Sequence, residues 1–186
     1  MKDIIVVEHN PKWEDEYNKA KSFYEKIMSD IDVEIVHVGS TSVKDLWAKP
    51  VLDIDIIVDC EEDSKRAIKA LVNIGYIHVG NRGIPGREAF TYDEENFNLN
   101  WMEHHLYVCL KGNENVINHL LLKKHLIKSK KDRDAYSNLK RKLAKKYPND
   151  IDSYVYYKTA LILSFLKEEG MNMEELKRIE EENNND

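Results

Sequence analysis

Cysteine is scarce in this chain of 186 residues: only Cys60 and Cys109 are present, far apart in the sequence. Neither belongs to a Cys-x-x-Cys pair, so the sequence excludes a disulfide framework and a zinc-finger spacing. Long apolar runs are also missing, since no stretch approaches the roughly 18 residues that span a bilayer. The opening MKDIIVVEHN is too short and too soon acidic for a signal peptide. We therefore expect a cytoplasmic protein with no membrane partner.

An excess of positive charge is missing as well. The 34 acidic and 28 basic residues give a net charge of −6, which does not attract nucleic acid to the whole molecule. Basic residues do gather between positions 123 and 146, but Asp132 and Asp134 interrupt them and no nucleic-acid motif is present. We interpret this segment as two solvated helix faces, so RNA binding is the least favoured function.

The hydrophobic pattern predicts an α/β half followed by a helical half. Runs rich in β-branched and aromatic residues predict strands over 3–8, 33–39, 51–58, 76–80, 88–92 and 104–110. Helical spacing of apolar residues predicts helices over 11–29, 64–76, 115–129, 133–147 and 152–169. We expect an α/β core over 1–111, a helical region packed on it over 112–170, and an acidic, partly disordered tail over 171–186.

Two aspartates interrupt the apolar run VLDIDIIV. Side chains alternate along a strand, so Asp53 and Asp55 share one face, with Cα atoms about 7 Å apart. Two carboxylates on a half-buried strand repel one another, and a divalent cation held between them removes that repulsion. A solvent-facing strand surface is the alternative explanation.

A second motif, Gly39-Ser40, ends the strand expected before this one. Ser42 and Asp45 have capping-box spacing, which predicts a short helix directly after the turn. A glycine turn followed by a helix N-terminus is a plausible phosphate cradle. Together with the aspartate pair, it predicts a site for a nucleoside triphosphate with Mg²⁺.

The two motifs carry a family resemblance. Val38-Gly39-Ser40, a gap of twelve residues and then Asp53-Ile54-Asp55 resemble the signature of the DNA polymerase β-like nucleotidyltransferase superfamily. HVGSTSV, LWAKPVLDIDIIV, GIPGREAF and HHLYVCL together resemble the bacterial GrpB family within it. The resemblance implies an α/β (α+β) nucleotidyltransferase-like mixed sheet flanked by helices, with a C-terminal helical bundle. It also implies transfer of a nucleoside monophosphate from a triphosphate to an unidentified hydroxyl of a small molecule, protein or RNA.

The same resemblance assigns roles to residues of this chain. Asp53 and Asp55 are expected to be catalytic and to hold Mg²⁺, or Mn²⁺ in its place. The positions expected to contact the nucleotide phosphates are Gly39, Ser40, Thr41, Lys49, Arg87 and Lys158. Lys49 and Arg87 also have a simpler explanation as surface charges, and Lys158 as a lysine beside an apolar helix stripe.

The third carboxylate of the superfamily has no obvious counterpart. The strand that should carry it reads EHHLYVCL, which offers Glu103 as a catalytic acid, or a histidine in its place. His104 and His105 point to opposite faces, so only one can enter the site, and we expect His105 to be a metal ligand. Glu88 on the preceding strand is a further option. Without a third acid, the alternative function is a catalytically silent nucleotide-binding or scaffold module.

Overall fold

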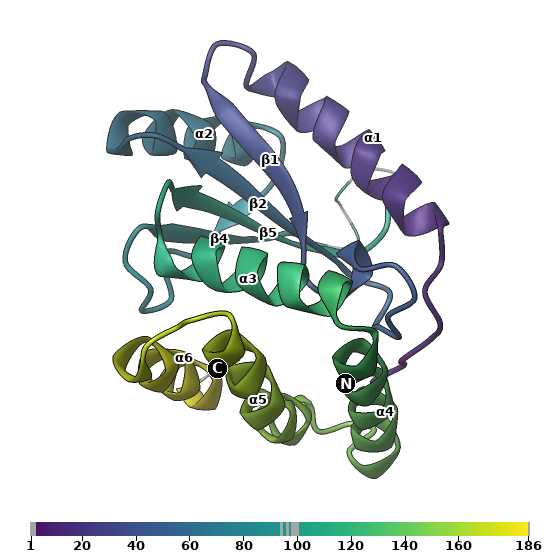
Figure 1. The fold of residues 1–186 in the computed structure, drawn as a ribbon. Coiled ribbons are helices and arrows are strands. Elements are labelled where there is room, and N and C mark those ends of the chain that lie inside the picture. The colour runs from purple at the N-terminus through teal and green to yellow at the C-terminus, as the bar shows by residue number, and fades with distance from the viewer. Residues whose placement is uncertain (1–2, 94, 96, 98–100, 186) are drawn as a thin grey trace. The chain divides into compact units, whose positions relative to one another are not determined.

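The computed structural model describes residues 3–93, 95, 97 and 101–185. Five strands in one mixed sheet and six α-helices lie in this part of the chain (Figure 1). The chain divides into two compact units. We call residues 11–38 and 51–117 the sheet unit, and residues 1–10, 39–50 and 118–186 the helical unit. This division differs from the boundary expected at residue 112, because the segment after the first strand packs with the C-terminal helices through Val43 and Leu46.

The strands of the sheet unit follow the order β1-β2-β5-β4-β3. Their bounds are β1 Val33–Val38, β2 Leu52–Val58, β3 Ile77–His78, β4 Arg87–Thr91 and β5 His104–Leu110. Only β2 and β5 pair in parallel, and the other neighbours are antiparallel. The mixed sheet expected from the sequence is therefore confirmed, although β3 is shorter than predicted.

One face of this sheet packs against helices. Leu52, Ile54 and Ile56 are fully buried on it, as alternation along β2 requires. Helix α1 (Lys12–Ile27) contacts β1 on this face, where the Tyr17 hydroxyl donates to the Ile35 carbonyl at 2.8 Å. Helix α2 (Glu61–Asn73) contacts β2 and β5 (Figure 1). The apolar alternation of β2 thus leaves its aspartates on the opposite face.

The opposite face carries the odd-numbered residues of β2. In register with them lie His105, Tyr107 and Cys109 of β5. Helix α3 (Glu114–Lys128) begins in the sheet unit, where Val116 packs against Ile57 and Cys109. This face therefore combines an apolar end with the end that carries Asp53 and His105.

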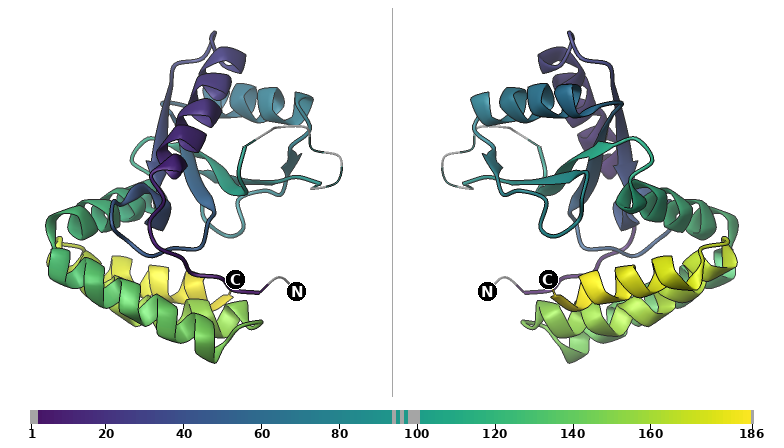
Figure 2. Two further views of the ribbon diagram at one scale, coloured as in Figure 1. Left: turned by 90° about the vertical axis from the view of Figure 1, so that its right-hand side faces the viewer. Right: turned by 90° about the vertical axis from the view of Figure 1, so that its left-hand side faces the viewer.

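The helical unit is built from α4 (Lys130–Lys146), α5 (Ile151–Glu168), α6 (Met173–Asn185) and the C-terminal part of α3. In both views of Figure 2, α5 lies beside α4 and α6. Ser129 and Asp150 cap α4 and α5 by accepting from backbone N–H groups. The core residues from the four helices include Leu126, Tyr136, Phe165, Leu166, Leu176 and Ile179. In the described part of the chain, no helix is both long enough and apolar enough to cross a membrane.

The predicted strand over residues 3–8 does not form. Val7 makes a single bridge to Ala48, with N–H to carbonyl distances of 2.9 and 3.0 Å. Ile4 instead packs against Leu143 and Tyr154 of the helical unit. Beyond this bridge, no strand in the described part of the chain pairs with residues 3–8. The apolar side chains of this segment pack on the helices instead.

The acidic tail is more ordered than the sequence suggests. Gly170, at φ 99°, ends α5, and α6 follows over Met173–Asn185. Leu176 and Ile179 are buried against α5 at helical spacing, which offsets the cost of ordering this charged segment.

Candidate functional site

Asp53 and His105 lie side by side on the face of the sheet opposite α1 and α2. They are register partners on the parallel strands β2 and β5, so their side chains leave the sheet on the same side. The His105 Nδ1 atom lies 2.8 Å from Asp53 Oδ1. The His105 side chain is 53% exposed and that of Asp53 is 29% exposed, which leaves the pair accessible to a ligand. In a neutral ring, Nδ1–H donates to Asp53 and Nε2 carries the lone pair.

Asp55 lies further along the same face and is completely buried. Its register partners are Val36 on β1 and Tyr107 on β5. Burial raises the pKa of the nearby Cys109 thiol, and the negative charge of Asp55 raises it further. The two aspartates therefore share a face as predicted, but only Asp53 lies at its exposed end.

His104 points into the opposite, helix-covered face. Its Nε2 contacts the hydroxyls of Tyr76 and Tyr24, and its Nδ1 lies 3.1 Å from the Met102 carbonyl. Burial lowers the pKa of His104 from 6.5 to about 4. His104 is therefore a neutral interior histidine, separated by the sheet from Asp53.

The acidic alternatives differ in position. Glu88 is in register with Val108 on the helix-covered face, where its carboxylate lies 2.6 Å from His78 Nε2. Glu88 is thus removed from the aspartate face. Glu103 is exposed and precedes β5, and its carbonyl accepts from the Leu52 N–H at 2.9 Å. Among these candidates, His105 makes a hydrogen bond to Asp53.

The Gly39-Ser40 motif forms a turn in the helical unit. Gly39 has φ 67° and ψ −170°, a conformation that requires glycine. A single 3₁₀ turn follows over Ser40–Ser42, and the Ser42 hydroxyl donates to the Gly39 carbonyl at 2.8 Å. The α-helix predicted from Ser42 and Asp45 does not form, because Asp45 adopts a left-handed φ of 64°. A helix dipole therefore does not provide positive potential at this turn.

A buried lysine supplies positive charge at the turn instead. Lys140 of α4 donates from Nζ to Ser40 Oγ at 2.9 Å and is only 2% exposed. Its ammonium also lies 4.4 Å from the centre of the Tyr136 ring. Lys140 was not among the sequence candidates, because the basic segment around it was interpreted as two solvated helix faces. The available signal was spacing: Lys140 lies four residues after Tyr136 and three before Leu143, on the buried stripe of α4.

The remaining phosphate candidates lie in varied settings. Thr41 is buried within the 3₁₀ turn, and Lys49 is half-buried before Pro50. The Lys158 ammonium lies 5.4 Å from the centre of the Tyr154 ring on α5. Their assignment to phosphate stays a prediction.

Arg87, another position expected to contact the phosphates, lies within β4. It is 6% exposed on β4, its guanidinium donates to Asn115 at 3.3 Å, and it lies 5.0 Å from the centre of the Tyr107 ring. These contacts hold the guanidinium within the sheet unit, on the same face as Asp55.

Known proteins resemble this chain in sequence and in fold. The GrpB protein family matches residues 3–168. The chain belongs to the GrpB family. The glutamate-rich protein GrpB of Alkalihalophilus pseudofirmus is 31% identical over 167 residues, covering 89% of this chain and 95% of the relative. YqkA of Bacillus subtilis is 28% identical, covering 82% of this chain and 43% of that protein.

Solved structures place this GrpB chain in a wider fold group. The crystal structure of the conserved protein GrpB from Enterococcus faecalis matches with a TM-score of 0.76 and 28% identity, covering 94% of this chain and 98% of that one. The Cid1 poly(U) polymerase with MgGTP bound matches with a TM-score of 0.51 and 14% identity, covering 84% of this chain and 50% of Cid1. The second likeness establishes the nucleotidyltransferase fold and nothing of the reaction.

Proposed function

We propose that this GrpB-family chain binds a nucleoside triphosphate with Mg²⁺ and transfers its nucleoside monophosphate to a hydroxyl acceptor. The observation that carries the proposal is the contact between Asp53 Oδ1 and His105 Nδ1, 2.8 Å apart at the exposed end of one face of a nucleotidyltransferase-like sheet. We expect the reaction to take place in the cytoplasm, with a small molecule, a protein or an RNA as acceptor.

The donor set of this face suits a magnesium ion shared with a nucleotide. Mg²⁺ is usually bound by one or two carboxylates, several waters and the phosphates of the substrate. Asp53 and Asp55 supply two carboxylates on one face, two residues apart. Mn²⁺ accepts the same oxygen ligands and is a suitable replacement. The bound ion would neutralise charge on the triphosphate.

His105 is proposed to take the role of the third acid. The acceptor oxygen forms a bond to the α-phosphorus, the bond from that phosphorus to the bridging oxygen breaks, and pyrophosphate leaves. The acceptor proton passes to Nε2 of His105, since a histidine is a suitable base near neutral pH. Asp53, which accepts from Nδ1, orients the ring and stabilises the imidazolium that forms.

The turn at Gly39-Ser40 is proposed to bind the phosphates through its backbone and the Ser40 hydroxyl. The family resemblance of the Gly39-Ser40 and Asp53-Ile54-Asp55 motifs supports a role for the turn in the same reaction. Lys140 adds a positive charge that holds Ser40 in place.

A nucleotide-binding module without catalysis is the second candidate. The complete burial of Asp55 favours it, because a buried carboxylate is less accessible to an incoming ion. A scaffold of this kind would keep nucleotide affinity and release no pyrophosphate.

Pyrophosphate release separates the two candidates. Each of the four triphosphates is incubated with the protein, Mg²⁺ and a cell extract as the source of acceptor. We expect one triphosphate to release pyrophosphate with the wild type, and the Asp53→Asn/Asp55→Asn variant to fall to background. Glu34→Gln is the matched control, because Glu34 is an exposed carboxylate on the same face of the sheet. Equal release by the wild type and the double variant would rule out transfer at these residues.

A further inference from the structure

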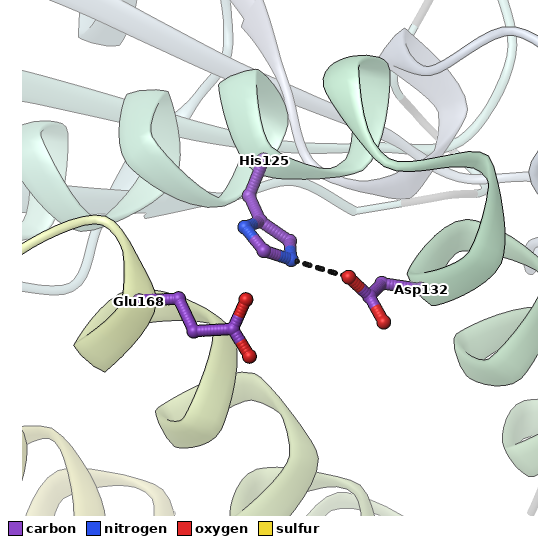
Figure 3. Close-up of side chains that lie close together, drawn as sticks. All are labelled: His125, Asp132 and Glu168. Carbon is purple, nitrogen blue, oxygen red and sulfur yellow. Dashed lines mark hydrogen bonds and ion pairs between the residues drawn. The ribbon is translucent and has the colours of Figure 1, made fainter.

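A second group of potential metal ligands lies in the helical unit. His125 of α3, Asp132 of α4 and Glu168 of α5 each direct one ligand atom toward the others, all within 4.8 Å (Figure 3). His125 Nε2 lies 3.1 Å from Asp132 Oδ2. Two ligands bound at about 2.0–2.1 Å to one tetrahedral ion lie about 3.3 Å apart. The spacing of these two atoms thus already suits a shared ion.

The second ring nitrogen of His125, Nδ1, has a hydrogen-bond partner of its own. His125 Nδ1 lies 3.3 Å from Glu169 Oε1, and the His125 side chain is only 5% exposed. When Nε2 binds a metal ion, the ring donates its Nδ1–H to this carboxylate. A ligating histidine in proteins almost always has such a partner for its second nitrogen.

The carboxylates around His125 divide into two roles. Lys124 pairs with Glu169 at 2.8 Å, which balances the charge of this carboxylate. Ser129 donates to Asp132 Oδ2 at 2.6 Å, which fixes the Asp132 carboxylate. Asp132 and Glu168 thus bring two negative charges to one imidazole. A divalent cation balances that charge.

The C-termini of α3 and α5 add a favourable field, which the N-terminus of α4 at Asp132 partly offsets. His125 lies in the last turn of α3, and Glu168 is the last residue of α5. The carbonyl groups at helix C-termini carry partial negative charge and attract cations. Glu168 is exposed at its helix end, so its side chain is able to move the remaining distance toward an ion.

We propose that His125, Asp132 and Glu168 form a site for a divalent transition-metal ion, with Zn²⁺ as the representative. One imidazole with two carboxylates suits Zn²⁺ better than Mg²⁺, which prefers oxygen ligands alone. The bound ion links the ends of α3, α4 and α5. The site is separate from Asp53 and His105, and it does not depend on the proposed transfer.

Calorimetric titration of the full chain with Zn²⁺ tests the proposal. We expect one equivalent to bind to the wild type, and to the Asp53→Asn/His105→Gln variant, in which the sheet ligands are removed. Glu168→Gln should weaken Zn²⁺ binding at least about tenfold, and Glu169→Gln about 10–100-fold through loss of the Nδ1 partner. Glu174→Gln, another exposed glutamate of the helical unit, should bind as the wild type does. Millimolar Mg²⁺ should not compete.

Because Glu168 is exposed, its variant is expected to fold, and circular dichroism verifies this. The proposal is overturned if the wild type takes up no Zn²⁺, or if Glu168→Gln binds it as tightly as the wild type. Loss of binding in the Asp53→Asn/His105→Gln variant alone would assign the ion to the sheet unit and overturn it equally.

Discussion

The sheet unit and the helical unit each place a histidine beside carboxylates, but the two settings differ. His105 is 53% exposed and meets Asp53, whereas His125 is 5% exposed and lies between Asp132 and Glu169. An exposed pair contributes about 0–1 kcal/mol to folding, while breaking a buried one costs several times more. Substitutions in the first pair should therefore affect chemistry, and those in the second should affect stability.

The largest effect is expected from His105→Ala. Loss of the base should reduce pyrophosphate release about 100-fold or more. The urea midpoint should stay close to that of the wild type, because the side chain is exposed. His105→Asp restores a third carboxylate, so it should retain more Mg²⁺-dependent release than His105→Ala. Equal activity of the wild type and His105→Ala would remove the role given to this histidine.

His125→Ala should have the opposite profile. We expect the free energy of unfolding to fall by about 2–4 kcal/mol, since Asp132 and Glu169 each lose one of their partners and the stacking on Phe165 is lost. Urea denaturation at pH 7 with a chelator present measures this loss without metal. His105→Ala in the same assay should lose less than about 1 kcal/mol. Similar losses for both variants would contradict the contrast between the units.

His104, next to His105 but on the buried face, predicts a pH dependence. Its pKa falls from 6.5 in the unfolded chain to about 4 in the folded protein. Between these values the unfolded chain binds the proton and the folded protein does not, so stability falls as the pH falls. The loss from this group should be about 2 kcal/mol between pH 7.5 and pH 5. Urea midpoints across this range should change less in His104→Gln, and an unchanged slope would disprove the assignment.

A smaller effect is expected from Lys140→Met. Methionine keeps the apolar stem beside Tyr136 but loses the donor to Ser40. Affinity for the nucleotide should fall about tenfold, which corresponds to about 1.4 kcal/mol. Lys142→Met, an exposed lysine of the same helix, is the matched control. Equal affinities in the two variants would make Lys140 a purely structural residue.

The sheet and most helices were predictable because each repeats one period. The alternation in VLDIDIIV gave both the strand and the shared face of Asp53 and Asp55. The segment 3–8 was misjudged because strand formation depends on a partner edge that is distant in sequence. The order of the tail was not predicted, because its acidic composition indicates disorder. The helical spacing of Leu176 and Ile179 was the signal for a packed helix.

The candidate site was predictable only for residues of a single strand, because the register between neighbouring strands does not follow from a local pattern. From the sequence, His105 was the expected metal ligand and Glu88 a further option, and the register of β5 with β2 and β4 places them on opposite faces. Lys140 lies 100 residues after Ser40, so its contact depends on how α4 packs in the helical unit. Side-chain pairs of this kind follow from tertiary structure and not from a local pattern.

Asp53 is proposed to belong to a nucleotide site that depends on a divalent ion. Calorimetric titration of the wild type and Asp53→Asn with each triphosphate, with and without Mg²⁺, tests it most directly. We expect nucleotide binding by the wild type that strengthens with Mg²⁺, and binding at least about tenfold weaker in Asp53→Asn. Equal binding heat in both proteins, or no nucleotide heat in either condition, would contradict it.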